Sequence, residues 1–152
     1  MEDNIQLNAH NKEEYPPMHT AEHIINGLMN KKYGCGRAFS AHIEKKKSKV
    51  DYHLDHELTQ DELKAIEAEV NDVIKQDMEV WTEYAKKEDM AGRFDLTRLP
   101  DDASETVRIV HVGDYDECLC VGLHVGRTSE IGEFRISSGS WKEGVQRIVF
   151  RV

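Results

Sequence analysis

Apolar residues recur at helical spacing in two long segments of the chain. The first runs from Met18 to Tyr33, with two prolines before it and two glycines after it, as is typical of a helix start and a helix end. Its apolar stripe consists of Ala21, Ile24, Ile25 and Leu28. The second segment extends to about Asp77, and Thr59 and Glu62 at its start match a capping box. The pattern therefore predicts two amphipathic helices.

The other apolar runs have the alternation or the β-branched content of strands. These runs are Ala38 to Glu44, Lys49 to Leu54, Val80 to Tyr84, Val107 to Val112, Glu117 to Val121, Gly132 to Ser137 and Val145 to Val152. Because helices come early and strands cluster in the last third, we expect a single α+β domain. Its sheet should be mainly antiparallel and should pack with the N-terminal helix and the second long helix.

Length and composition are consistent with one domain that needs no disulfide bonds. A chain of 152 residues can bury a core, and its 3 cysteines form no disulfide framework. Residues 1–15 are polar and acidic and do not resemble a signal peptide, so we place the domain at 16–152. No apolar window has the length of a membrane helix. We therefore expect a cytoplasmic protein with no membrane partner.

The formal net charge is −9 at pH 7. Binding that coats nucleic acid depends on neutralising phosphates, so this charge argues against such a protein, and we expect no DNA partner. The basic residues are nevertheless concentrated locally: Lys45, Lys46, Lys47 and Lys49 are close together in the sequence, and Lys31, Lys32 and Arg37 lie just upstream. The lysines either contact phosphates or form a solvated hairpin tip.

His19 and His23 are four residues apart on the first predicted helix. Both imidazoles therefore project from the same side and can reach one ion. At about 100° per residue, the apolar stripe lies nearly opposite them, and their own face also carries Asn26 and Asn30. The two histidines therefore face either solvent or a cleft, and a cleft would suit a metal site.

A second pair of possible ligands, Cys120 and His124, lies far downstream, where a predicted strand ends in a turn that contains glycine. Zinc accepts thiolate and imidazole together in tetrahedral sites. Cys118 and Cys120 point the same way on a strand, so either could supply the sulfur, although the spacing to His124 favours Cys120. The alternative is a buried structural cysteine beside an incidental histidine.

Three motifs occur in order along the chain: His19-Thr20-Ala21-Glu22-His23, Cys120 to His124, and Thr128 to Gly132. They resemble the HxxxH, CxxxH and TxEIG segments of the editing domain of alanyl-tRNA synthetases and of the free-standing AlaX proteins, to which a domain of threonyl-tRNA synthetases is related. The resemblance runs from about Pro17 to the C-terminus. It implies that residues 16–152 are a tRNA-synthetase-type editing domain in a free-standing protein.

This resemblance implies a hydrolase that cleaves the aminoacyl ester of mischarged tRNA. The implied substrate is Ser-tRNA(Ala) or Gly-tRNA(Ala), so the implied partner is alanine tRNA that carries the wrong amino acid. The implied cofactor is Zn²⁺, which could polarise the ester, orient the amino acid or activate a water. Its implied ligands are His19, His23, Cys120 and His124.

Other side chains are candidates for catalytic or binding roles in such a site. Three residues, Thr20, Ser40 and Thr128, offer hydroxyl groups that could recognise a substrate hydroxyl, and their alternative roles are helix capping and turn hydrogen bonds. Asn30 and Glu130 could orient the metal ligands. The residues that could hold tRNA phosphates are Arg37, Lys45, Lys46 and Lys47.

Two other functions fit parts of the sequence. The segment from His19 to His23 also matches the H-x-x-E-H motif of a zinc peptidase, with Glu22 as general base, but this interpretation leaves Cys120 and His124 unexplained. A non-catalytic zinc module would use the same four ligands only to join the helix to the sheet.

Overall fold

The structure is a computed structural model that describes residues 15–90 and 106–152, so all but the last residue of the predicted polar segment 1–15 lies outside the described residues. The described elements are α1 (Pro16–Tyr33), β1 (Ser40–Ile43), β2 (Ser48–His53), α2 (Gln60–Lys75), β3 (Val80–Lys86), η1 (Lys87–Met90), β4 (Thr106–Val112), β5 (Asp116–Leu119), η3 (Thr128–Ile131), β6 (Arg135–Lys142) and β7 (Val145–Arg151).

The strands form two antiparallel sheets. A larger sheet has the order β1-β2-β7-β6, and a smaller sheet has the order β3-β4-β5. Every pairing between these strands is antiparallel. The predicted α+β class is therefore confirmed, and the strands that we expected in one sheet are divided between two.

Local sequence explains where both helices begin and end. Proline occupies the first turn of α1, and Gly34 ends the helix in the left-handed conformation with φ 65°, where its N–H donates to the Asn30 carbonyl at 2.8 Å. The predicted capping box of α2 is present, because the Thr59 side chain accepts from the Glu62 N–H and the Glu62 carboxylate accepts from the Thr59 N–H.

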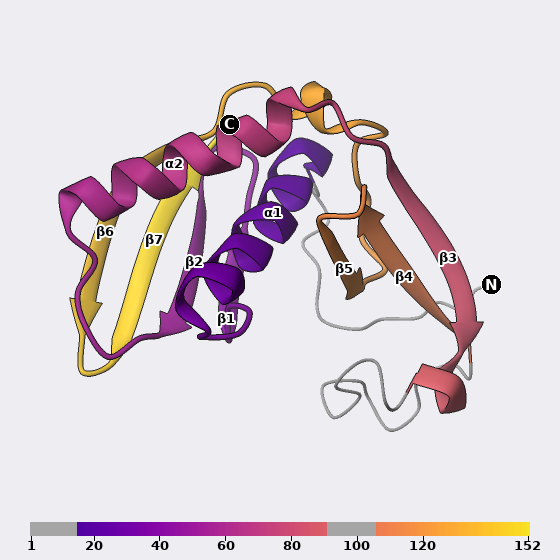
Figure 1. Cartoon of the computed structure of the whole chain (residues 1–152), viewed down its shortest axis with the longest axis horizontal. Helices are drawn as coiled ribbons and strands as arrows, with labels where there is room; N and C mark the ends of the chain where they lie inside the picture. The colour runs from indigo at the N-terminus through magenta and orange to yellow at the C-terminus, as the bar shows by residue number, and fades with distance from the viewer. Residues whose placement is uncertain (1–14, 91–105) are drawn as a thin grey trace.

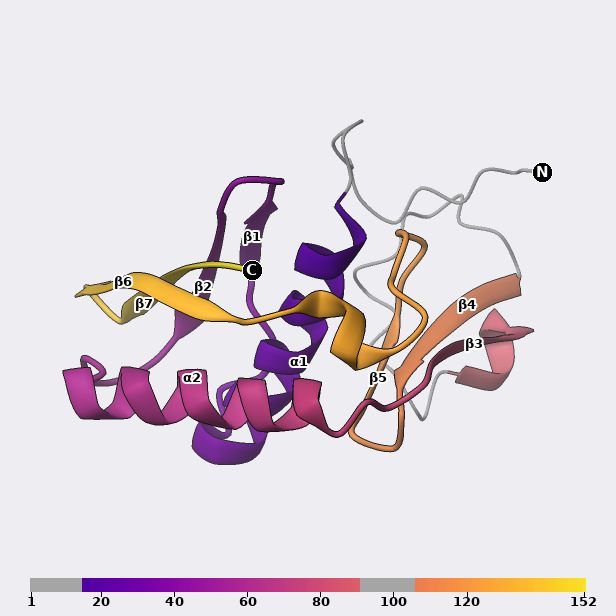
Figure 2. The ribbon, with the colours of Figure 1, turned by 90° about the horizontal axis from the view of Figure 1, so that it is seen from above.

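Helix α1 lies between the two sheets, and α2 crosses one face of the larger sheet (Figures 1 and 2). The apolar side of α1 packs with α2 and the larger sheet in one core. The fully buried members of this core include Ile24, Ile25, Ile66, Val70, Phe134, Ile148 and Phe150. The smaller sheet has a separate apolar cluster around Met90, Val107 and Ile109. Helix α1 therefore has a second side that is available to the smaller sheet.

The prediction for strand β6 was wrong in its position. The sequence suggested Gly132 to Ser137, whereas the strand runs from Arg135 to Lys142. Its serines and glycine are typical of a turn, but the backbone is held by pairing with β7 from Arg151 to Val145. At Gly139 an added Cβ would lie 2.9 Å from Leu63 of α2, so the absence of a side chain lets the helix approach the strand.

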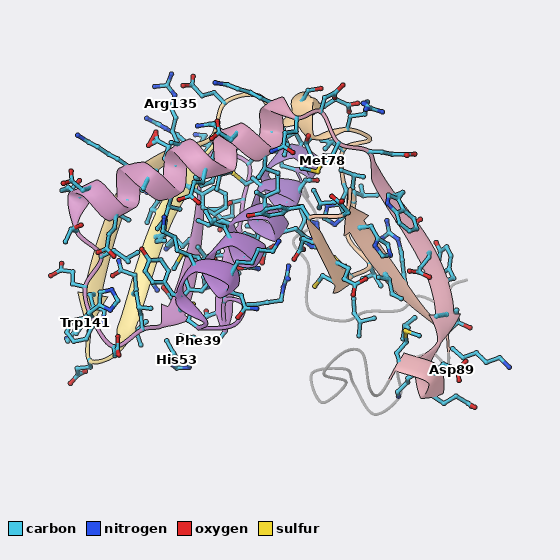
Figure 3. All side chains as sticks on the ribbon, viewed as in Figure 1. Phe39, His53, Met78, Asp89, Arg135 and Trp141 are labelled. Atoms are coloured by element: carbon cyan, nitrogen blue, oxygen red, sulfur yellow. The ribbon has the colours of Figure 1, made fainter. Side chains whose placement is uncertain are left out.

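The end of α2 is tied to the segment that precedes β6. The Met78 N–H donates to Thr128 Oγ1 at 2.8 Å, and the Thr128 N–H donates to the Met78 carbonyl at 2.9 Å. The Thr128 hydroxyl also bonds the Ile74 carbonyl at 3.0 Å. Figure 3 shows Met78 at this junction, between α2 and the smaller sheet. These bonds connect the two sheets on the side where α2 leads into β3.

Candidate metal centre

Four side chains from distant parts of the chain converge beside α1. His19 and His23 come from the helix, and Cys120 and His124 come from the loop that follows β5. One ligand atom from each residue lies within 4.8 Å of the ligand atoms of the other three. His19, His23 and Cys120 are buried, and His124 is half-buried. The structure thus brings together the four residues predicted as metal ligands.

The helical repeat of α1 explains the first half of this group. His19 and His23 lie one turn apart on α1, which stands between the two sheets (Figure 1), and His23 Nδ1 lies 3.9 Å from the carboxylate of Asp116 in the smaller sheet. Their exposed fractions are only 7% and 3%. Of the two alternatives left by the sequence, solvent or a cleft, the structure therefore places the histidines in the interior between the helix and the smaller sheet.

The loop after β5 supplies the second half, and hydrogen bonds to its backbone groups fix its position. The Cys120 N–H donates to the Arg108 carbonyl at 3.1 Å, which continues the pairing with β4 by one residue. Arg108 Nη1 in turn donates to the Gly122 carbonyl at 2.8 Å. The Gly122 N–H points back at Cys120 Sγ at 3.4 Å, a contact that favours a thiolate. Cys118, the other candidate sulfur, lies within β5 and outside the four-residue group.

Hydrogen bonds set the orientation of two of the imidazoles. His19 Nδ1 lies 3.1 Å from the Leu123 carbonyl, which can only accept, so Nδ1 carries the proton and Nε2 has the lone pair. His124 Nδ1 lies 2.9 Å from Thr20 Oγ1, and the same hydroxyl oxygen accepts from the Val125 N–H at 3.2 Å. Both rings therefore direct Nε2 toward Cys120, at 3.4 Å and 3.7 Å from Sγ.

These distances fit a tetrahedral zinc ion. Zn–N bonds of about 2.0 Å and Zn–S bonds of about 2.3 Å place neighbouring ligand atoms roughly 3.3 to 3.7 Å apart in a tetrahedron. The two N···S distances fall in this range. Three imidazoles and one thiolate are also a donor set that zinc accepts. The residues present therefore fit the ion that the sequence implies.

Burial determines the charge of the donors. It lowers the pKa of His124 to about 2, with a further contribution from His19, and it lowers the pKa of His23 well below its ordinary value. Burial also raises the pKa of the Cys120 thiol to about 12. The imidazoles of His23 and His124 are therefore neutral, as metal ligands must be, and the sulfur requires a cation beside it to lose its proton.

The four predicted catalytic or orienting residues lie at different places. Thr20 is fully buried and contacts His124 directly. Glu130 accepts from the Gly126 N–H at 3.3 Å, two residues after His124 in the chain. Asn30 accepts from the Gly36 N–H at 2.9 Å and closes the turn after α1, and Ser40 opens β1 opposite Asp51.

The predicted phosphate-binding residues lie at the two ends of one hairpin. Lys45, Lys46 and Lys47 are exposed in the turn between β1 and β2. At the other end of these strands, Figure 3 shows Phe39 beside His53, and their rings stack with centroids 4.0 Å apart. Arg37 precedes this pair and is bound to Asp116 through two hydrogen bonds of 2.8 Å and 3.1 Å.

A cleft of about 570 Å³ opens where α1 meets the turn between β4 and β5. Asn30, Arg37 and Asp116 belong to its lining, together with the exposed Trp81 of β3. The cleft therefore adjoins the metal centre through Asp116, whose carboxylate lies 3.9 Å from His23.

Two carboxylates beside the histidines were not predicted as parts of an editing site. Glu22 Oε1 lies 3.8 Å from His19 Nε2, and Asp116 Oδ2 lies 3.9 Å from His23 Nδ1. The sequence contains a pattern that could have identified Glu22, because it is the acidic residue of the H-x-x-E-H match. No sequence pattern identifies Asp116, since its approach to α1 depends on the packing of the smaller sheet.

Comparison with known proteins shows that the sequence of this chain is similar to parts of tRNA synthetases. Residues 107–149 match the family described as the threonyl and alanyl tRNA synthetase second additional domain, and this match includes Cys120 and His124. The alanine–tRNA ligase of Fervidobacterium nodosum is 34% identical over 132 residues, which are 86% of this chain and 15% of that protein. The ligase of Halorubrum lacusprofundi is 29% identical over 149 residues, or 95% of this chain and 16% of that protein.

The family match and these relatives support the superfamily of synthetase editing domains that the sequence motifs indicate. The chain spans about 15% of the length of the curated relatives it matches. Among the described residues, no helix is both long and apolar enough to cross a membrane.

Proposed function

We propose that this protein is a zinc-dependent hydrolase that removes the wrong amino acid from alanine tRNA, with Ser-tRNA(Ala) as the preferred substrate and Gly-tRNA(Ala) as a second one. The observation that carries the proposal is the convergence of His19, His23, Cys120 and His124 on one point. The similarity to alanine–tRNA ligases supports the choice of tRNA.

In this proposal the four converging side chains hold Zn²⁺. When bound, the ion would supply an electrophile for the ester carbonyl or an activated water, and for this it would take one further ligand beside the four side chains. Water adds to the carbonyl carbon, and its proton passes to Glu22 Oε1, the carboxylate oxygen 3.8 Å from His19. The bond between the carbonyl carbon and the ribose oxygen then breaks, and that oxygen takes the proton back from Glu22. The products are the free amino acid and uncharged tRNA.

The surrounding residues orient the centre and the substrate. Thr20 fixes the His124 ring, and Glu130 holds the backbone two residues beyond it. Serine differs from alanine by a hydroxyl, and a site that hydrogen-bonds a hydroxyl can reject the analogue without it by about 10⁴ to 10⁵. Ser40 is the hydroxyl group that we propose for this recognition, because the Thr20 side chain is fully buried and already bonded to His124 and to the Val125 N–H.

The tRNA would approach along the β1–β2 hairpin toward the cleft. The exposed lysines at 45, 46 and 47 supply positive charge in a protein whose net charge is −9. Arg37 and Asn30 line the cleft, where the 3′ end of the acceptor arm would lie. No base of the tRNA needs to be recognised for this contact.

The direct test is deacylation of Ser-tRNA(Ala), measured beside correctly charged Ala-tRNA(Ala). We expect the wild type to hydrolyse only the seryl ester, and Cys120→Ala to abolish the activity. Cys118→Ala is the matched control, because it removes a sulfur two residues away that does not belong to the group of four. Equal loss in both variants would contradict the assigned ligand, and no hydrolysis by the wild type would refute the substrate.

A structural zinc module is the second candidate function. The observation that favours it is that four protein donors, three of them buried, leave a tetrahedral ion no open position. In that case chelation would unfold the domain, because the ion would supply folding energy outright. For the hydrolase we expect chelation to remove the activity while the far-ultraviolet circular dichroism persists.

A further inference from the structure

We infer that Asp116 is a positioning residue whose carboxylate holds the His23 ring at Nδ1, the nitrogen that faces away from the proposed ion. Arg37 binds this carboxylate, and Gly27 leaves room for it beside the helix. The inference rests on the proposed metal centre and adds the residue that completes it. Asp116 opens β5 opposite Val112 of β4, so the smaller sheet presents it to α1. Its side chain is 6% exposed.

His23 Nδ1 is the buried side-chain nitrogen that lacks a hydrogen-bond partner among the described residues. A buried donor without a partner costs about 1 to 3 kcal/mol, so such an atom calls for an explanation. The Asp116 carboxylate is 3.9 Å away, and a shift of about 1 Å would make a hydrogen bond. A proton held on Nδ1 leaves the Nε2 lone pair for the ion, and a carboxylate behind the ring raises the basicity of that nitrogen.

Arg37 holds the Asp116 carboxylate in place. Its Nη1 donates to Oδ1 at 2.8 Å and its Nη2 donates to Oδ2 at 3.1 Å, so the pair is bidentate. The planar guanidinium fixes the plane of the carboxylate as well as its position. It also supplies the positive charge that a nearly buried carboxylate needs. We therefore assign to Arg37 a role that acts through Asp116, in addition to any contact with tRNA.

Gly27 explains how the carboxylate reaches the helix. It lies one turn after His23 on α1, in a helix interior, where glycine costs about 1 kcal/mol relative to alanine. An added Cβ at Gly27 would lie 2.9 Å from Asp116 Oδ1 and 3.3 Å from Asp116 Cγ. The missing side chain therefore makes room for the carboxylate beside His23.

The decisive measurements are zinc affinity, by competition with a chromophoric chelator, and the protonation of the His23 nitrogens, by ¹⁵N NMR of the zinc-loaded protein. For Asp116→Asn we expect affinity to fall by about 10- to 100-fold, the usual effect of losing such an outer partner. Gly27→Ala should lower affinity in the same direction while both charges remain. Asp114→Asn is the matched control, because it removes an exposed carboxylate from the adjacent turn.

A merely structural ion pair between Asp116 and Arg37 would lower the unfolding midpoint but would leave affinity and the His23 signals unchanged. Wild-type affinity in both Asp116→Asn and Gly27→Ala would overturn the inference, as would a proton on Nε2 with zinc on Nδ1. Neither measurement needs a tRNA. A wild type that binds zinc but hydrolyses no ester would thus refute the proposed function alone.

Discussion

His19 Nε2 and Cys120 Sγ lie 3.4 Å apart, although 101 positions separate the two residues in the chain. The distance follows from the packing of the smaller sheet against α1, and polar contacts independent of any ion maintain it. His19 Nδ1 donates to the Leu123 carbonyl, and Thr20 Oγ1 accepts from the Val125 N–H. Helix and loop are therefore joined by contacts that do not use the four proposed ligand atoms.

We expect the affinity for zinc to rise with pH by about tenfold per unit from about pH 6 to pH 8. Cys120, whose pKa burial raises to about 12, must release a proton when the ion binds. Burial keeps the imidazole of His124 neutral in this range, with its pKa at about 2, so it releases none. Chelator competition at several pH values measures the slope.

The variant Cys120→Ser should bind zinc weakly and lose this pH dependence, whereas Cys118→Ser should keep it. A flat profile in the wild type would show that no thiol proton is released and would contradict the sulfur ligand.

Replacing Thr20 with valine should destabilise the metal-free protein by about 1 to 3 kcal/mol, because the buried Val125 N–H loses its acceptor. Urea denaturation measures the change in the free energy of unfolding. Thr20→Ser is the matched control, since it retains the hydroxyl and should recover most of the stability. Thr20→Val should also weaken zinc binding through the freed His124 ring. Wild-type stability in Thr20→Val would refute this role of the hydroxyl.

Local patterns were sufficient to predict several elements of the fold. The capping box of Thr59 and Glu62 and the left-handed Gly34 depend on neighbours within a few residues, so the sequence carries them directly. The four converging residues could be predicted because each pair has its own short-range spacing. Sequence spacing also separated Cys120 from Cys118, since a turn back to His124 needs a residue beyond the strand.

Features that depend on packing could not be predicted in the same way. Strand β6 contains serines and a glycine, and its partner β7 determines its extent. The division into two sheets follows from the position of α1 between them, which no single segment encodes. Asp116 reaches His23 only because β5 packs on α1 at Gly27, and no short motif records this contact.

Replacing Glu22 with glutamine should lower kcat for deacylation by about 10² to 10⁴, the usual contribution of a general base. The carboxylate lies 3.8 Å from His19 Nε2 but is outside the group of four, so zinc content should not change. Glu57→Gln, at an exposed position, is the control. Unchanged kcat in Glu22→Gln would assign the proton to another acceptor.

The lysine turn should account for part of the salt dependence of tRNA binding. If residues 45, 46 and 47 contact phosphates, replacing all three with alanine should weaken binding and reduce the slope of log affinity against log salt by about 0.7 to 0.9 per lost contact. The turn should keep its shape in this variant, because Ser48 Oγ accepts from the Glu44 N–H at 3.1 Å and bonds its carbonyl at 3.4 Å.

The control, called the α2 variant, replaces Lys64 and Lys75 of α2 and Lys142 of β6 with alanine, so it also removes three exposed lysines, all of them outside the hairpin. Filter binding at several salt concentrations gives both slopes. The hairpin variant should show the smaller slope, and the α2 variant should match the wild type. Equal slopes in the hairpin variant and the wild type would mean that the lysines form only a solvated tip, and that the positive charge for tRNA comes from elsewhere on the protein.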